Sequence, residues 1–164
     1  MPSLRNFLEN TGRSASATGL TGLDQTATAF SWGAWLWVSR NLALGRPTLW
    51  GHADNQASPK NGILVFANQD GGIRLGVQTA ANNSFDSVAG IVPHRAWCHV
   101  GVMYNGSRYF TYRNGVLVSS VACSTTPTVS GTRATQIGWN VSSSTSLRSS
   151  RLWDIRVFPA LALS

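Results

Sequence analysis

Short runs of β-branched and aromatic residues alternate with Asn, Gly, Ser and Pro along most of this chain of 164 residues. The clearest example is residues 97–122, where the dipeptides Asn105-Gly106 and Asn114-Gly115 separate three such runs. Asn-Gly favours a type I′ turn, because that turn needs a positive φ at both central positions. The segment therefore predicts three antiparallel strands joined by two tight turns.

Further strands are expected on both sides of this segment. The strongest run is 30–39, which is apolar at almost every position, so we expect both of its faces to be covered. Residues 62–68 and 73–79 predict a hairpin, and the other candidates are 49–51, 87–88, 135–139 and 151–158. Short strands with regular turn signals and almost no helical period predict an all-β fold, a two-sheet antiparallel β-sandwich.

The N-terminal residues differ from this body. Leu4, Phe7 and Leu8 share one helical face, and residues 13–28 are small and polar. We expect a short N-terminal arm, 1–25, followed by one domain, 26–164. The sequence shows neither the apolar core of a signal peptide nor the roughly 18–20 apolar residues of a bilayer span. We therefore expect synthesis in the cytoplasm and no membrane partner.

The charge of the chain is strongly basic but evenly spread. Thirteen basic residues stand against six acidic ones, which gives a formal net charge of +7. The arginines are scattered, with no run of three, so the pattern argues against a nucleic-acid partner. Charged residues are only 12% of the chain, and the polar surface is therefore expected to consist of Ser, Thr, Asn and Gly.

The two cysteines are not expected to form a disulfide. With two-residue turns, residue 98 lies opposite residue 113, and residue 113 opposite residue 116. Cys123 then lies roughly 20 Å from Cys98, whereas a disulfide needs Cα atoms within about 7 Å. We predict two free, buried thiols.

The order of several motifs resembles that of laminin G-like domains over about residues 28–164. The similar segments are Phe30-Ser-Trp-Gly-Ala-Trp35-Leu, Trp97-Cys-His99-Val-Gly-Val, Tyr104-Asn-Gly, Tyr112-Arg-Asn-Gly, Gln136-Ile-Gly138 and Leu152-Trp-Asp154-Ile-Arg156. The resemblance implies a concanavalin A-like jelly roll that binds glycans or proteins. It also implies that Trp35, Trp97 and Trp153 are core residues and that His99 and Asp154 are structural.

The acidic residues argue against an enzyme. A glycoside hydrolase, which some relatives with this architecture are, needs two carboxylates flanking the scissile bond. The chain has one Glu, Glu9, and its Asp residues are 24, 54, 70, 86 and 154, no two of them within four residues. It has no Gly-x-Ser-x-Gly segment, and His52 and His94 have no partner at zinc-ligand spacing. A glycosidase is the disfavoured alternative.

Calcium is the one metal that the resemblance suggests. Laminin G-like domains often bind Ca²⁺ through Asp, Asn and backbone oxygens. The weak candidates here are Asp54 and Asp70, and the sequence has no Asp-x-Asp motif. Ordinary turn chemistry is the favoured interpretation of both residues, so we expect no cofactor, with calcium as the alternative.

Seven tryptophans suggest ring stacking on sugars or the filling of an interface. Trp32 and Trp35 have opposite parity and are expected to face opposite sides of their strand. Two other tryptophans are expected at junctions between strands and loops. The candidate sugar site there consists of Trp50, His52, Asp54, Trp139 and Asn140. The alternative is that these tryptophans fill the core or a subunit interface.

These observations favour a non-enzymatic recognition or structural module. Compact laminin G-like modules without a signal peptide resemble parts of bacteriophage virions. We therefore expect a virion surface protein, a decoration or fibre component that binds glycan or protein. It would form a homo-oligomer or dock on capsid or tail proteins through residues 1–25. The alternative is a stand-alone carbohydrate-binding lectin.

Overall fold

The computed structural model describes residues 8–10, 15–17, 29–38, 48–54, 61–78, 83–123, 125, 135–137 and 150–159. All regular elements within these ranges are β-strands. No helix long and apolar enough to cross a bilayer is found among the residues described.

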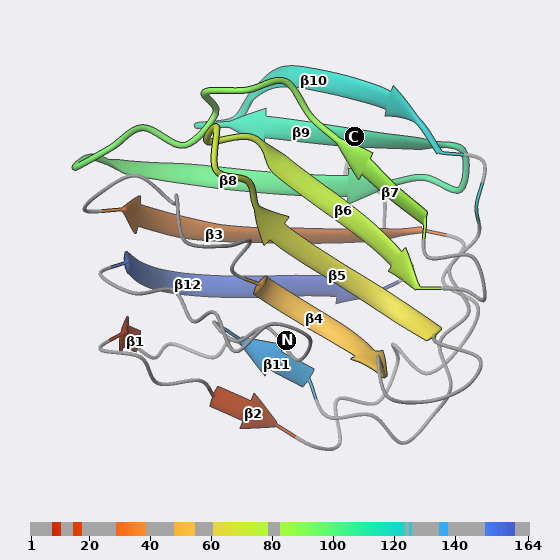
Figure 1. The fold of residues 1–164 in the computed structure, drawn as a ribbon, viewed down its shortest axis with the longest axis horizontal. Coiled ribbons are helices and arrows are strands. Elements are labelled where there is room, and N and C mark those ends of the chain that lie inside the picture. The colour runs from red at the N-terminus through yellow and green to blue at the C-terminus, as the bar shows by residue number, and fades with distance from the viewer. Residues whose placement is uncertain are drawn as a thin grey trace.

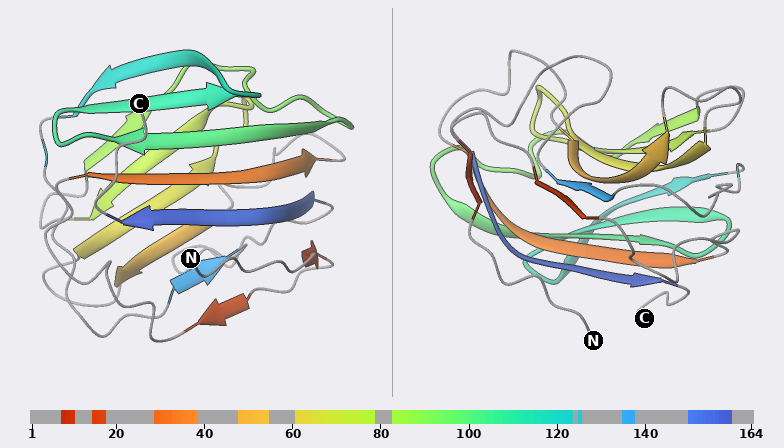
Figure 2. Two further views of the ribbon diagram at one scale, coloured as in Figure 1. Left: turned by 180° about the vertical axis from the view of Figure 1, so that it is seen from behind. Right: turned by 90° about the horizontal axis from the view of Figure 1, so that it is seen from below.

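The strands form two six-stranded antiparallel sheets that lie face to face (Figures 1 and 2). The first sheet has the order β1 (Leu8–Asn10), β12 (Ser150–Pro159), β3 (Phe30–Val38), β8 (Trp97–Tyr104), β9 (Arg108–Arg113), β10 (Val116–Ala122). The second has the order β2 (Ala15–Ala17), β11 (Thr135–Ile137), β4 (Thr48–Asp54), β5 (Asn61–Ala67), β6 (Ile73–Gln78), β7 (Asn83–Asp86). The predicted two-sheet β-sandwich is confirmed.

The core lies between the sheets and follows the alternation of each strand. In β3, Phe30, Trp32 and Leu36 are buried against the second sheet, where the ring of Trp50 lies 6.4 Å from that of Phe30. The opposite face of β3 is only partly covered, since Trp35 keeps contact with solvent. Trp32 and Trp35 thus face opposite sides, as predicted, whereas the expectation that both faces of this strand are covered is wrong.

The three-stranded segment β8–β9–β10 is confirmed, but one of its turns differs. Asn114 and Gly115 have φ values of 50° and 81°, as a type I′ turn requires, and Val116 lies opposite Arg113. The first connection is longer, because the Asn105 side chain accepts hydrogen bonds from the backbone N–H groups of Ser107 and Arg108. Arg113 therefore lies opposite Val100, two residues away from the predicted register.

The prediction of two free, buried cysteines is confirmed despite this shift of register. Cys98 and Cys123 are both free and both buried. Burial raises the pKa of each thiol, which disfavours the reactive thiolate.

The hairpin β5–β6 is also confirmed, closed by a hydrogen bond from the Asn68 N–H to the Gly72 carbonyl. The next strand is β7, at 83–86, and the strand expected at 87–88 is absent from the described residues there. The Ser87 side chain instead accepts a hydrogen bond from the Ile73 N–H, which ends the pairing with β6.

Two short strands of the N-terminal segment pair with strands from the C-terminal part of the chain. Strand β1 pairs with β12, with Leu8 opposite Leu152, and β2 pairs with β11, with Ala15 opposite Ile137. These parts of residues 1–25 are edge strands of the two sheets, and residues 8–10 do not continue a helix. The docking role of the N-terminal segment stays a prediction.

Candidate functional site

The outer face of the first sheet is built from rows of residues that lie directly opposite one another on neighbouring strands. Figure 2, left, shows this face toward the viewer, with the second sheet behind it. From one end to the other, the four rows are Arg151–Trp37–Trp97, Trp153–Trp35–His99, Arg156–Gly33–Gly101–Tyr112 and Phe158–Ser31–Met103–Phe110. The third row has two glycines at its centre, between the row of Trp153, Trp35 and His99 and a row that carries Phe158, Met103 and Phe110.

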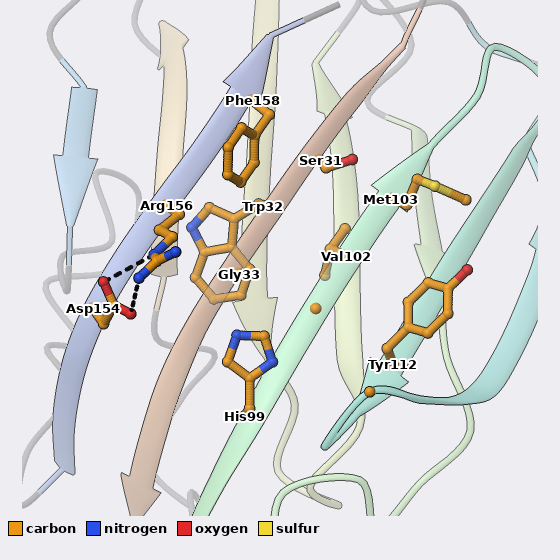
Figure 3. Close-up of a pocket in the computed structure, with 12 residues that line it drawn as sticks. Ser31, Trp32, Gly33, His99, Val102, Met103, Tyr112, Asp154, Arg156 and Phe158 are labelled. Atoms are coloured by element: carbon orange, nitrogen blue, oxygen red, sulfur yellow. Dashed lines mark hydrogen bonds and ion pairs between the residues drawn. The ribbon is translucent and has the colours of Figure 1, made fainter. Parts of the chain in front are cut away.

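This pair of glycines forms the floor of a hollow of about 510 Å³ that we call the glycine trough. The β12 side carries Asp154, Arg156 and Phe158, and the β9 side carries Tyr112 (Figure 3). The volume lies within the range of roughly 300–1,000 Å³ found for small-ligand sites. A Cβ built on Gly33 would lie 3.3 Å from the His99 ring, so any side chain at this position would fill the hollow.

Asp154 and Arg156 form the polar wall of the trough. From Trp35 to Gly33 the chain advances two residues on β3, whereas between their partners, Trp153 and Arg156, it advances three residues on β12. This bulge contains Asp154, whose φ is 50°. Its carboxylate accepts hydrogen bonds from Nε and Nη2 of Arg156, at 3.0 and 2.8 Å (Figure 3). The pair raises the pKa of Arg156 and fixes its guanidinium at the rim.

His99 closes one end of the trough. Its ring packs edge-on against Trp35, with centroids 5.6 Å apart. Desolvation by burial lowers the pKa of His99; the Asp154 carboxylate opposes this shift and Arg156 adds to it. The imidazole is therefore neutral at pH 7 and offers one donor and one acceptor to a ligand. The resemblance implied only a structural role, and the structure places His99 in the lining.

Next to the trough lies a group of indole rings that we call the tryptophan cluster: Trp35, Trp37, Trp97 and Trp153. The rings of Trp35 and Trp153 are 6.4 Å apart, and Arg151 lies 5.3 Å from the centre of a Trp37 ring. Trp97 is 40% exposed and Trp153 47%. The expectation that Trp35, Trp97 and Trp153 are core residues is wrong, because all three occupy outward positions of their strands.

The sugar site predicted from the sequence includes three residues of β4, in the other sheet. Trp50 is 1% exposed and packs in the core, so its ring presents no face to a ligand at the surface. His52 and Asp54 are on β4, and the pairing of Trp50 with Ile137 brings β4 beside β11, as the prediction required. Trp139 and Asn140 lie outside the described residues. The structure therefore contradicts Trp50 as a stacking residue, while the roles of His52, Asp54, Trp139 and Asn140 stay predictions.

Of the two calcium candidates, the structure describes the side chain of Asp70, and that of Asp54 lies outside the described part. The carboxylate of Asp70 accepts a hydrogen bond from the Gly72 N–H at 2.8 Å, which is turn chemistry. No group of three or more His, Cys, Asp or Glu side chains suited to a metal ion occurs in the part of the chain that the structure describes.

The sequence indicates the trough only when the parity of several residues on two strands is considered together. Gly33, Trp35, His99 and Gly101 have the outward parity of β3 and β8, once Trp32 is placed in the core. The register that brings Gly33 opposite Gly101 depends on long-range pairing. Arg156 faces outward only because of the bulge, which no periodicity predicts.

The fold is shared with many solved structures. No curated protein matches the chain significantly in sequence. The carbohydrate-binding module CBM40 of the Ruminococcus gnavus IT-sialidase, bound to α2,3-sialyllactose, has a TM-score of 0.65 at 11% identity, covering 94% of this chain and 95% of that one. Domain 4 of AbnA, an arabinanase from Geobacillus stearothermophilus, in complex with arabinotriose, has a TM-score of 0.65 at 14% identity, covering 97% and 83%.

The receptor-binding part of a toxin has the same architecture. The botulinum neurotoxin serotype D binding domain has a TM-score of 0.69 at 16% identity, covering 96% of this chain and 39% of that one. At these low identities, the TM-scores establish a common fold and no more. The family described as the concanavalin A-like lectin/glucanases superfamily matches residues 10–163. The chain therefore belongs to the concanavalin A-like lectin/glucanases superfamily.

Proposed function

We propose that this protein is a non-catalytic glycan-binding module, and that its binding site comprises the glycine trough and the tryptophan cluster. The observation that carries the proposal is the Gly33–Gly101 floor, which opens a hollow between aromatic and polar side chains on a sheet face. A sugar ring has an apolar face and a rim of hydroxyl groups, so it needs both kinds of partner.

The lining supplies these partners. Tyr112, Phe158 and the neighbouring Trp153 offer aromatic surface to the apolar face of a ring. His99, Asp154 and Arg156 offer hydrogen-bond donors and acceptors at the rim. A mostly apolar hollow with a few convergent polar groups is typical of small-ligand sites.

Two proteins of the same fold were solved with oligosaccharides: the CBM40 module with α2,3-sialyllactose and AbnA domain 4 with arabinotriose. They support a glycan, rather than a protein, as the first ligand to test.

The carboxylates around the trough argue against hydrolysis of the bound glycan. Glycosidic cleavage by two side chains needs carboxyl groups about 5–9.5 Å apart. Among the described residues that line the trough, Asp154 is the single carboxylate, and it is held by Arg156. We therefore propose binding without turnover.

A glycan array followed by isothermal titration calorimetry tests this function, with Gly101→Ala as the blocking variant. A Cβ at this position would lie 3.5 Å from the Tyr112 Cβ, an ordinary contact, so the variant is expected to fold. The methyl group raises the floor of the trough, and we expect the affinity for glycan to fall at least about tenfold, which is about 1.4 kcal/mol.

The matched control is Ser120→Ala, on strand β10 of the same sheet and outside the trough lining. Its affinity is expected to equal that of the wild type. Equal binding by wild type and Gly101→Ala would contradict the proposed site, and an array without any binding would contradict the function.

We also propose, from the sequence, that the module is displayed on a virion surface as a decoration or fibre component. The test is to look for this chain in purified virions by mass spectrometry and to label it on their surface with antibodies. Absence of the chain from particles would leave the alternative of a stand-alone lectin.

A further inference from the structure

The polar wall of the trough presents a donor and an acceptor side by side. The Arg156 side chain is 53% exposed, and Asp154 uses two of its five N–H donors. The carboxylate oxygens and the remaining guanidinium N–H groups lie at the same rim (Figure 3). We infer that the ring held in the trough is an uncharged sugar with two adjacent hydroxyl groups, and that Asp154 excludes acidic sugars. This inference rests on the proposed function.

Adjacent hydroxyl groups fit this wall because one can donate to Asp154 while its neighbour accepts from Arg156. Each hydroxyl is both donor and acceptor, so the pair satisfies both partners without a change in their ion pair. Hydrogen bonds to ionised groups are the stronger ones. The wall therefore recognises a neutral diol.

A ligand carboxylate fits less well for two reasons. Asp154 already occupies the Nε–Nη2 edge of Arg156, so a ligand carboxylate has only the Nη1–Nη2 end of the guanidinium left for a bidentate pair. A second carboxylate at this rim would also face the charge of Asp154 directly. The formal charges of Asp154 and Arg156 cancel, so the pair supplies no net attraction for an anion.

The other charged side chains that the structure places on this face, those of Arg151 and Arg108, lie away from the row that contains Arg156. Arg151 lies beside Trp37, four residues along β3 from Gly33, and Arg108 is four residues along β9 from Tyr112. Each separation is roughly 13 Å, beyond the Debye length of about 8 Å at physiological salt. Arg113 lies opposite Val100, a residue that faces the core.

The test measures binding of the full chain to matched neutral and acidic probes. Calorimetry in about 0.15 M salt compares lactose, xylotriose and arabinotriose with 3′-sialyllactose and trigalacturonate. We expect a neutral probe to bind, and the acidic probes to bind at least about tenfold more weakly.

Asp154→Asn is the decisive variant. Asn tolerates the left-handed region as Asp does, so the bulge is expected to persist. The substitution removes the negative charge and frees part of Arg156. We expect the affinity for the neutral probe to fall roughly tenfold and the affinity for 3′-sialyllactose to rise.

Asp86→Asn is the matched control. Asp86 also pairs with an arginine, Arg74, but in the second sheet. This variant is expected to leave both affinities unchanged.

The outcomes separate the two proposals. If an acidic probe binds wild type more tightly than the neutral probes, and Arg156→Ala abolishes that binding, the inference is overturned while the glycan-binding function stands. If Asp154→Asn leaves the preference unchanged, the inference is likewise overturned. If no probe binds and the array is also negative, the proposed function fails and the inference fails with it.

Discussion

Trp35 and Trp153 lie directly opposite each other on β3 and β12, with ring centroids 6.4 Å apart and ring planes inclined by 38°. His99 continues the same row on β8. The three rings form a continuous aromatic edge beside the glycine trough. A ligand longer than one sugar can therefore extend from the trough onto this edge, along the direction of the strands.

Replacement of Trp153 by alanine is expected to weaken glycan binding with little loss of stability. Trp153 is 47% exposed, so truncation removes stacking surface but opens no core cavity. We expect roughly a tenfold loss of affinity and a change in the free energy of unfolding below about 1 kcal/mol. Calorimetry and urea denaturation measure the two quantities.

The contrasting variant is Trp50→Ala. Trp50 is buried between the sheets, and its loss is expected to lower the free energy of unfolding by about 3–5 kcal/mol. Similar stability losses in both variants would contradict the outward position of Trp153.

The two thiols are expected to react only after unfolding. Cys98 and Cys123 are fully buried, and burial raises the pKa of both. Titration with a chromogenic disulfide reagent should detect almost no thiol in the native protein and two per chain in denaturant. A disulfide between them, detected by mass spectrometry, would contradict the register of β8, β9 and β10.

Stability is expected to fall with acidification because of His99. Its folded-state pKa is lowered, chiefly by desolvation, so below the unfolded-state pKa of about 6.5 the unfolded chain binds the proton more readily. The destabilisation is absent above that pKa and grows until the pH falls below the folded-state pKa. In His99→Asn this part of the pH dependence should disappear, as measured by urea denaturation between about pH 5 and 8. An unchanged pH profile would assign the effect to other groups.

The turn at Asn114-Gly115 is expected to depend on glycine. Gly115 has a φ of 81°, in the region that a side chain disfavours. Gly115→Ala should lower the free energy of unfolding by about 1–2 kcal/mol. Gly101→Ala, at a position without a positive φ, is the control and should change it by less than about 0.5 kcal/mol. Equal effects in urea denaturation would argue against turn strain.

The sequence predicted local structure well where the signals are local. Asn114-Gly115 predicted a tight turn, because both residues supply the required φ. Asn105-Gly106 carries the same dipeptide but forms a longer connection, since the Asn105 side chain bonds to the two following backbone N–H groups beyond Gly106. Side-chain capping of this kind competes with the two-residue turn and is not visible in the dipeptide itself.

The candidate site was harder to predict than the fold. Indole rings are equally suited to a core and to a binding face, so Trp50 and Trp153 could not be assigned from residue type alone. Their places depend on which face of each strand meets the other sheet. The glycine trough depends further on the pairing of Gly33 with Gly101, residues 68 positions apart in the sequence.

Because of the bulge, the side chains that β12 presents on the outer face of the first sheet depend on the number of residues in this strand. Residues that precede the bulge keep their side, whereas residues that follow it exchange sides if one residue is deleted. Loss of one bulge residue would turn Arg156 and Phe158 toward the core and bring Val157 to the surface. A relative with a β12 strand one residue shorter would therefore retain the sandwich and lose this wall. Among such proteins, ligand preference could diverge through an insertion or a deletion without any substitution in the trough floor.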